Sequence, residues 1–106
     1  MMSEVVVVAD IGIVPEKREA ALAALRTLCE ETHAKDEGCL LYALQLDPAD
    51  ESHVFMIEKW SSAEALAAHS ATDHIKALGA SGTLSGAPQV TVLEPANFGD
   101  DELGTI

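Results

Sequence analysis

The sequence predicts an α+β fold whose elements follow the order β-α-β-β-α-β. Two observations favour it: four short apolar or β-branched segments lie at residues 4–13, 39–46, 53–60 and 89–95, and helical patterns follow the first and third of them. In this ferredoxin-like order, two helices cover one face of a four-stranded antiparallel sheet. A chain of 106 residues with 48% hydrophobic content suits one compact domain.

The first half of the chain begins with a strand and a helix. Residues 4–13 (EVVVVADIGI) are apolar at nearly every position, which is typical of a strand covered on both faces. Pro15 fits the first turn of a helix, and Glu16 follows at the positive end of the helix dipole. Apolar residues then recur at helical spacing, so residues 15–35 are predicted to form an amphipathic helix, closed by a turn at 36–38.

The middle of the chain has the pattern of a hairpin. Residues 39–46 (CLLYALQL) are expected to form the second strand, residues 53–60 (HVFMIEKW) the third, and residues 47–51 the loop between them. The only tryptophan of the chain shares one face of the third strand with a carboxylate. Strand alternation places on that face Val54, Met56, Glu58 and Trp60.

Helical signals follow the third strand. The run SSAE at residues 61–64 has the pattern of a capping box with Ser61 as the cap, and it opens a helix that continues to about Ser70. Thr72 or Asp73 can cap a further short helix.

The C-terminal part contains a loop, a strand and a tail. Residues 79–86 (GASGTLSG) are small and flexible, as in a plain linker or in a lid beside a pocket. After Pro88, residues 89–95 form the last predicted strand. We therefore expect a single domain over residues 1–96 and an acidic, frayed tail over residues 97–106.

The charge of the chain limits its partners. Eighteen acidic residues against six basic ones give a formal net charge of −12, which repels phosphate backbones and anionic lipid. Nucleic acid and membrane surfaces are thus not expected as partners, whereas neutral or aromatic ligands are. The N-terminus lacks a signal-peptide pattern and no stretch approaches membrane-spanning length, so the expected location is the cytoplasm.

No metal or cofactor is predicted. Cys29 and Cys39 do not form a CxxC pair, and we expect both to be reduced. Cys29 and His33 have a spacing that can ligate metal, but no third and fourth ligands follow nearby. The chain has no GxGxxG motif, P-loop or GxSxG elbow, so nothing suggests a bound nucleotide.

The strands themselves predict a homodimer. The first three are apolar on both faces, and the two helices can cover only one face of the sheet. A second copy of the chain is the economical cover for the other face, which predicts an isologous dimer.

The candidate site lies where the third strand gives way to helix. His69 and His74 are five residues apart, and a helix break near residues 72–73 could turn both toward the same space, where either can accept a proton at neutral pH. Each histidine could instead be a capping or core residue. Trp60 could line a pocket or fill the core, and Glu58 could be a strand-end ion-pair partner or a catalytic acid. Tyr42 could donate a hydrogen bond to a ligand oxygen or simply pack.

Five segments in order resemble the antibiotic biosynthesis monooxygenase domain family, in particular its quinol monooxygenase-like branch. They are VVVADIGIVPEKREAAL, DEGCLLYAL, FMIEKWSSAEALAAH, TDHIKAL and VTVLEP, and they cover nearly all of the chain up to Pro95. The resemblance implies a dimeric α+β barrel with a pocket between sheet and helices, where aromatic and histidine side chains surround a flat phenolic substrate. By position, Trp60, His69 and His74 match the family pattern, and Tyr42 matches a position that is commonly aromatic.

Two other activities found in the same family fit the chain less well. Heme-degrading members carry a pocket aromatic near the place of His69, a heme-ligating histidine near that of Gly79, and a catalytic asparagine around Ala9 or Asp10; this chain has none of the three. Isomerases of small phosphorylated hydroxyketones need a phosphate site, and the acidic composition offers none.

The first functional hypothesis is a cofactor-independent monooxygenase that oxidises a quinol, anthrone or similar polyphenol with dioxygen. His69, or else His74, would be the base, Trp60 and Tyr42 would orient the ring, and Met56, with Glu58 beside it, would complete the substrate-binding wall. A second hypothesis is a small-ligand-binding or stress-related dimer that turns nothing over. An isomerase or a decarboxylase-like activity in the same pocket is a third.

Overall fold

The computed structural model describes residues 3–106. Its elements confirm the predicted order, with the second helical region divided in two. In chain order they are β1 (Val5–Gly12), the short 3₁₀ turn η1 (Pro15–Lys17), α1 (Arg18–Lys35), β2 (Cys39–Leu46), β3 (His53–Trp60), α2 (Ala63–Ser70), α3 (Asp73–Ala80) and β4 (Gln89–Leu93).

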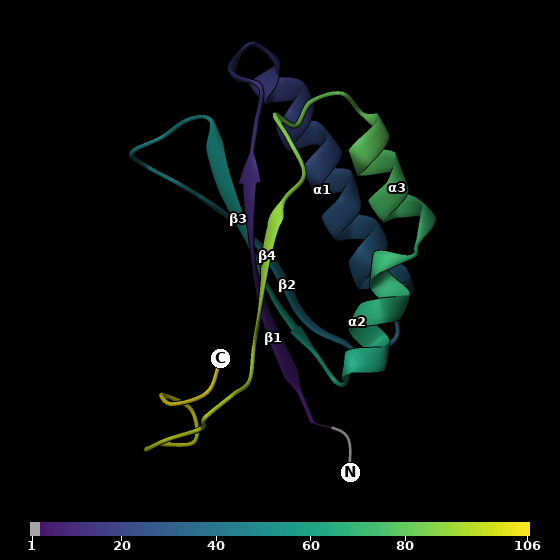
Figure 1. Ribbon diagram of the computed structural model, residues 1–106. Coiled ribbons are helices and arrows are strands. Elements are labelled where there is room, and N and C mark those ends of the chain that lie inside the picture. The colour runs from purple at the N-terminus through teal and green to yellow at the C-terminus, as the bar shows by residue number, and fades with distance from the viewer. Residues whose placement is uncertain (1–2) are drawn as a thin grey trace.

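The four strands form one antiparallel sheet in the order β2-β3-β1-β4. The helices lie along one side of this sheet (Figure 1). Glu58 of β3 pairs with Val7 of β1 and with Tyr42 of β2, so its side chain stands on a central strand. The register therefore places a carboxyl group in the middle of the face that the helices cover.

The core lies between the sheet and α1. Val54, Met56 and Trp60 of β3 are completely buried, as the alternation of that strand predicts. Leu25 and Leu28 of α1 pack into the same cluster, because their helical spacing turns both toward the sheet.

The capping prediction at the start of α2 was wrong by one residue. Ser62, not Ser61, has the extended backbone of an N-cap, and its hydroxyl accepts a hydrogen bond from the Ala65 amide. Ser61 instead donates its own backbone N–H to the Gly38 carbonyl. Of the two residues expected to cap α3, Thr72 and Asp73, it is Thr72 that does so, accepting from the Ile75 amide.

The segment predicted to be flexible at residues 79–86 is more structured than its composition suggests. Gly79 and Ala80 complete α3, and Leu84 forms an isolated bridge with Ile13. Thr83 is buried, and its carbonyl accepts from the Val14 amide. Loop residues therefore close over one end of β1.

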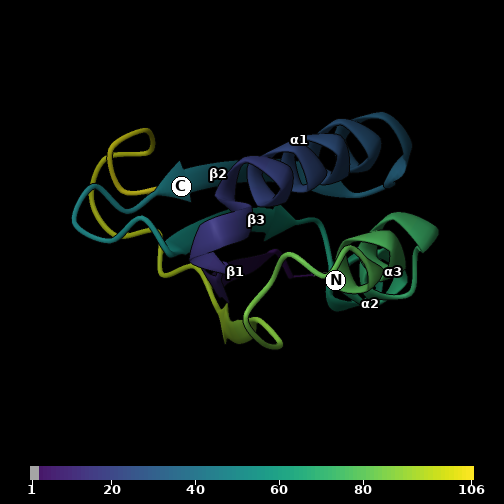
Figure 2. The same cartoon turned by 90° about the horizontal axis from the view of Figure 1, so that it is seen from above.

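The second face of the sheet has no helix over it (Figure 2). Val8, Phe55 and Ile57 point to this face and are only partly buried. Residues 94–106 contain no helix or strand, and the backbone oxygen of Ile106 accepts from Lys59 at 2.9 Å. Within residues 3–106, no helix is both long enough and apolar enough to cross a membrane.

Candidate active site

A cavity of about 220 Å³ lies between the sheet and the helices. Its walls are mostly apolar and come from all four strands and from α1, α2 and α3, with Val90 in β4 and Pro88 just before it. Small-molecule sites typically combine such walls with a few converging polar groups. Here those polar groups are the side chains of Tyr42, Glu58, His69 and Ser70.

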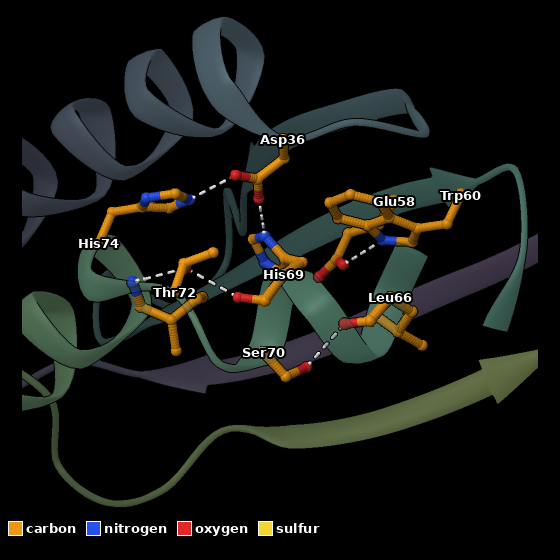
Figure 3. Close-up of polar contacts among 9 residues, drawn as sticks. Asp36, Glu58, Trp60, Leu66, His69, Ser70, Thr72 and His74 are labelled. Carbon is orange, nitrogen blue, oxygen red and sulfur yellow. Dashed lines mark hydrogen bonds and ion pairs between the residues drawn. The ribbon is translucent and has the colours of Figure 1, made fainter. Parts of the chain in front are cut away.

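His69 is the nitrogen base in the wall of this cavity. It lies in the last turn of α2, is 4% exposed, and its Nδ1 is 2.5 Å from Oδ2 of Asp36 (Figure 3). Asp36, which follows the last residue of α1, is equally buried in its side chain. Because Nδ1 faces the carboxylate, the second ring nitrogen, Nε2, is the one available to a ligand.

The turn after α1 fixes the position of Asp36. The Asp36 amide closes the helix by donating to the Thr32 carbonyl, and Gly38 then turns the chain with φ +81°. A side chain at Gly38 would place its Cβ 2.6 Å from Ser61 Oγ and from Ala65 Cβ. Glycine therefore allows the end of α1 to pack directly against the start of α2, which carries His69.

Burial and the Asp36 carboxylate shift the pKa of His69 in opposite directions. Loss of water around the ring lowers the pKa of His69, and the hydrogen bond that His69 donates to Asp36 raises it, with burial the larger effect. The ring is therefore neutral at pH 7 and can accept a proton.

His74 approaches the same carboxylate from the other side. Its Nε2 is 2.9 Å from Oδ1 of Asp36, but the alignment is too poor for a hydrogen bond, and the atom is buried. The ring lines a separate groove of about 410 Å³ between α1 and α3, together with Glu31 and Asp73. The break before α3 thus brings both histidines to one carboxylate, while only His69 lines the cavity.

The groove between α1 and α3, here called the outer groove, is larger than the cavity between the sheet and the helices, here called the inner cavity. The inner cavity is nevertheless the better candidate site. The groove lies between two helices, and among its charged residues Glu31 and Lys35 form an ion pair with each other. The inner cavity instead holds buried polar groups from three different elements around apolar walls.

Within residues 3–106, the cluster whose side chains could hold a metal ion is that of Asp36, His69 and His74. Their donor atoms lie within 4.8 Å of one another. Ligands of a tetrahedral zinc ion lie about 2.0–2.2 Å from the metal, and hence roughly 3.3 Å apart. The 2.5 Å contact between Asp36 and His69 is shorter than that and matches a hydrogen bond. His33, which has a metal-ligating spacing from Cys29, contacts the Tyr42 carbonyl through Nε2 at 2.8 Å.

Glu58 and Trp60 form a hydrogen-bonded pair at the edge of the cavity. The indole N–H of Trp60 donates to Oε1 of Glu58 at 2.8 Å. Burial raises the pKa of Glu58 to about 6, while the indole hydrogen bond acts in the opposite direction. Trp60 itself is completely buried and stands behind the cavity wall, not in it. In this position the Trp60 indole contacts Glu58 and the rings of Tyr42 and His69.

Tyr42 and Met56 lie where the sequence predicts a pocket wall, and both line the cavity. The Tyr42 ring meets the His69 ring edge-on, with centroids 5.0 Å apart, and the Trp60 ring at 6.1 Å. Burial, and next the neighbouring Glu58 carboxylate, raise the pKa of Tyr42. The phenol therefore keeps its proton and can donate a hydrogen bond into the cavity.

Asp36 is the site residue that sequence reasoning missed, because the run DEG signals a turn and nothing more. A signal was present, since a carboxylate at the C-terminus of a helix faces the negative end of the helix dipole. An acidic residue in that place suggests a partner elsewhere, and here the partners are two histidines.

Known proteins share both the sequence pattern and the fold. The profile of the family described as antibiotic biosynthesis monooxygenase matches residues 4–80. A curated Bacillus subtilis (strain 168) protein named "Putative monooxygenase YcnE" is 33% identical over 78 residues, covering 74% of this chain and 81% of that protein. Among solved structures, one from Caulobacter crescentus CB15 is 30% identical with a TM-score of 0.81, covering 88% of this chain and 90% of its own.

Rv0793 from Mycobacterium tuberculosis is 28% identical with a TM-score of 0.80, covering 92% of this chain and all of its own. The shared fold agrees with the arrangement of strands and helices described above. The matched segment includes Asp36, Glu58, His69 and His74. The chain belongs to the antibiotic biosynthesis monooxygenase family.

Proposed function

We propose that this protein is a cofactor-independent monooxygenase that oxidises a small quinol or related phenol with dioxygen. The family and the name of the Bacillus subtilis relative support a monooxygenase in general. One observation carries the finer proposal: a neutral histidine lies in the wall of an apolar cavity, with one ring nitrogen held by a buried carboxylate and the other available to a ligand.

This arrangement suits the activation of a phenol. Nε2 of His69 removes the hydroxyl proton, and Asp36 stabilises the imidazolium that forms. Tyr42 donates a hydrogen bond to a substrate oxygen. The electron-rich phenolate then reduces dioxygen itself, while the apolar walls exclude water. One oxygen atom enters the product and the other leaves as water.

The size of the cavity indicates a small substrate. Ligand sites commonly enclose about 300–1,000 Å³, and this cavity encloses about 220 Å³. A phenol of one or two rings fits that space better than a large polycyclic molecule does.

We also propose that a second copy of the chain covers the open face of the sheet. Phe55 and Ile57 of β3 lie there with Val8 of β1, partly exposed and without a helix over them. Sizing in solution tests this proposal with Ile57→Lys, against Lys76→Ala on an exposed position of α3 as the control. The wild type and the control should be dimeric and Ile57→Lys monomeric; a monomeric wild type would contradict the proposal.

The enzymatic proposal is tested by oxygen uptake in the presence of a metal chelator with a panel of quinols. With ¹⁸O₂, mass spectrometry should find one labelled atom in the product. Uptake should exceed that of a no-protein control and be lost in His69→Gln. If uptake equals the control for every quinol while the same compounds still quench Trp60 fluorescence, the protein is a binding protein and not an oxygenase.

A further inference from the structure

Glu58 is a buried carboxyl group that the mechanism above does not use. It is 5% exposed, and among residues 3–106 no lysine, arginine or histidine forms an ion pair with it. Burying a carboxylate without a counter-charge destabilises a protein, and such groups concentrate at functional sites. A glutamine could accept the Trp60 hydrogen bond equally well, so the structural contact alone does not explain a glutamate.

The reaction itself includes a second proton transfer, from a different atom of the substrate. A quinol converted to its oxygenated quinone loses two protons, one from a hydroxyl and one from the ring carbon that gains oxygen. His69 accounts for the first proton. The second is released only after the peroxide has formed, and it leaves a ring carbon and not the hydroxyl oxygen on which His69 acts.

We propose that Glu58 is this second base, which removes the proton from the peroxide-bearing ring carbon; the assignment rests on the proposed function. As that C–H bond breaks, its electrons form the new C=O bond, the O–O bond breaks, and hydroxide leaves. Glu58 then gives the same proton to the hydroxide, which becomes water. Both His69 and Glu58 end the cycle in their starting states, and no further oxidant or reductant is needed.

The geometry allows two bases to act on one ring. Glu58 comes from β3 and His69 from α2, both line the cavity, and each lies next to the Trp60 indole (Figure 3). Trp60 binds Oε1 of Glu58, so Oε2 is the oxygen available to a ligand. The His69 ring packs at 4.5 Å on the same indole. Trp60 thus orients both groups.

The surroundings of Glu58 favour its role as a base. The titratable groups that face it are Tyr42 and Cys39 of β2 and His69 of α2. The pKa of Glu58 is raised to about 6, which leaves the carboxylate ionised at pH 7 and a stronger base than an ordinary glutamate. The pKa values of Tyr42 and Cys39 are also raised, so both stay neutral at that pH.

The test compares the wild type with Glu58→Gln, Glu58→Asp and Glu64→Gln, the last on an exposed position of α2. The substrate is 1,4-naphthalenediol, with and without deuterium on the unsubstituted carbons of the hydroxylated ring. Glu58→Gln should still take up oxygen but form about 10²-fold less 2-hydroxy-1,4-naphthoquinone. It should release hydrogen peroxide and 1,4-naphthoquinone instead, because elimination of peroxide needs no base at the ring carbon.

Glu58→Asp should restore part of the hydroxyquinone and show a primary deuterium isotope effect on it, and Glu64→Gln should match the wild type. A second measurement, of tryptophan fluorescence, does not depend on activity. It reports on Glu58 because the only tryptophan of the chain is hydrogen-bonded to that residue. A Trp60 fluorescence titration should contain one transition that Glu58→Gln removes and another that His69→Gln removes.

The outcomes separate the two proposals. Oxygen uptake no greater than without protein would overturn both the monooxygenase and the role of Glu58. An active wild type with an equally productive Glu58→Gln would overturn only the role of Glu58. If a folded Glu58→Gln variant loses both oxygen uptake and hydroxyquinone formation, the proposed role of Glu58 is also overturned. Glu58 would then act before oxygen reacts.

Discussion

Asp36 contacts two histidines that lie in different environments. His69 is on its inner side, toward the cavity, and His74 is on its outer side, toward the groove. On the inner side, His69 is hydrogen-bonded to the carboxylate and lies against Tyr42 and Trp60 in the wall of an apolar cavity. On the outer side, His74 lies at ion-pair distance from the same carboxylate in a groove with charged residues.

The difference shows that a shared carboxylate does not make the two histidines equivalent. Burial lowers the pKa of His69 and keeps its ring neutral, and His69 lines a cavity of a size that suits a small molecule. His74 contacts the carboxylate on the opposite side from that space and can act on the chemistry only through Asp36. We infer that His69 is the catalytic residue and His74 a positioning residue.

The largest expected effect comes from replacing each histidine in turn. His69→Gln should lower kcat/KM by about 10³-fold, because it removes the base, whereas His74→Gln should lower it by less than about 10-fold. Steady-state oxygen uptake measures both. Equal losses in the two variants would break the distinction between the inner and outer sides.

Asp36→Asn should have the next largest effect. An amide can hold the wrong tautomer of His69 and cannot stabilise an imidazolium, so kcat should fall by about 10²-fold with little change in KM. Glu37→Gln removes the same charge from the adjacent exposed position and is the matched control. If both variants lose activity equally, net charge and not the Asp36 contact is responsible.

Larger side chains in the inner cavity or the outer groove should have a smaller effect on activity than the loss of His69 or Asp36. Ala9 lines the inner cavity and Ala77 lines the outer groove, so leucine at each position narrows one space only. Ala9→Leu should raise KM by about 10-fold, or about 1.4 kcal/mol of binding, and Ala77→Leu should leave it unchanged. Thermal unfolding shows whether Ala9→Leu still folds, because an added side chain can overpack a core.

The smallest effect concerns the pH dependence of folding stability, to which Glu58 and His69 contribute with opposite signs. The folded-state pKa of Glu58 is raised from 4.5 to about 6, so its stabilising contribution is present below pH 4.5 and is lost as pH rises through about 6, amounting to about 2 kcal/mol at most. The folded-state pKa of His69 is lowered from 6.5, so its contribution is present above pH 6.5 and is lost as pH falls through the lowered value.

Unfolding by urea between pH 4 and pH 8 measures both contributions. Relative to the wild type, Glu58→Gln should gain stability as pH rises, and His69→Gln should gain stability as pH falls. Parallel curves for either variant would contradict the corresponding pKa shift.

Much of the fold was predictable because its signals are local. The alternation of residues 53–60 predicted which side chains of β3 are buried, and the pair Thr72 and Asp73 predicted the start of α3. The error at Ser61 arose because two adjacent serines can both cap a helix, and a distant carbonyl, that of Gly38, decided between them. The order of the loop at Thr83 likewise depends on a distant partner, the amide of Val14 just after β1.

The candidate site was only partly predictable, because its central contact joins residues 33 positions apart. The residue types identified His69, His74 and Glu58, since histidine and glutamate are the side chains that carry protons. Asp36 stands in a turn sequence that has no pattern typical of a functional site. The position of Trp60 behind the cavity wall depends on the packing of α2 over β3. Direct stacking of Trp60 on the substrate remains a prediction.

The glycine turn after α1 has a consequence for motion. Because Gly38 touches Ser61 and leaves no room for a Cβ, the end of α1 and the start of α2 cannot move apart or rotate without breaking the same contacts. Asp36 and His69 should therefore keep their relative position whether the cavity is empty or filled. A preorganised pair of this kind loses little entropy when substrate binds, so the binding energy of the substrate can serve to orient its own ring.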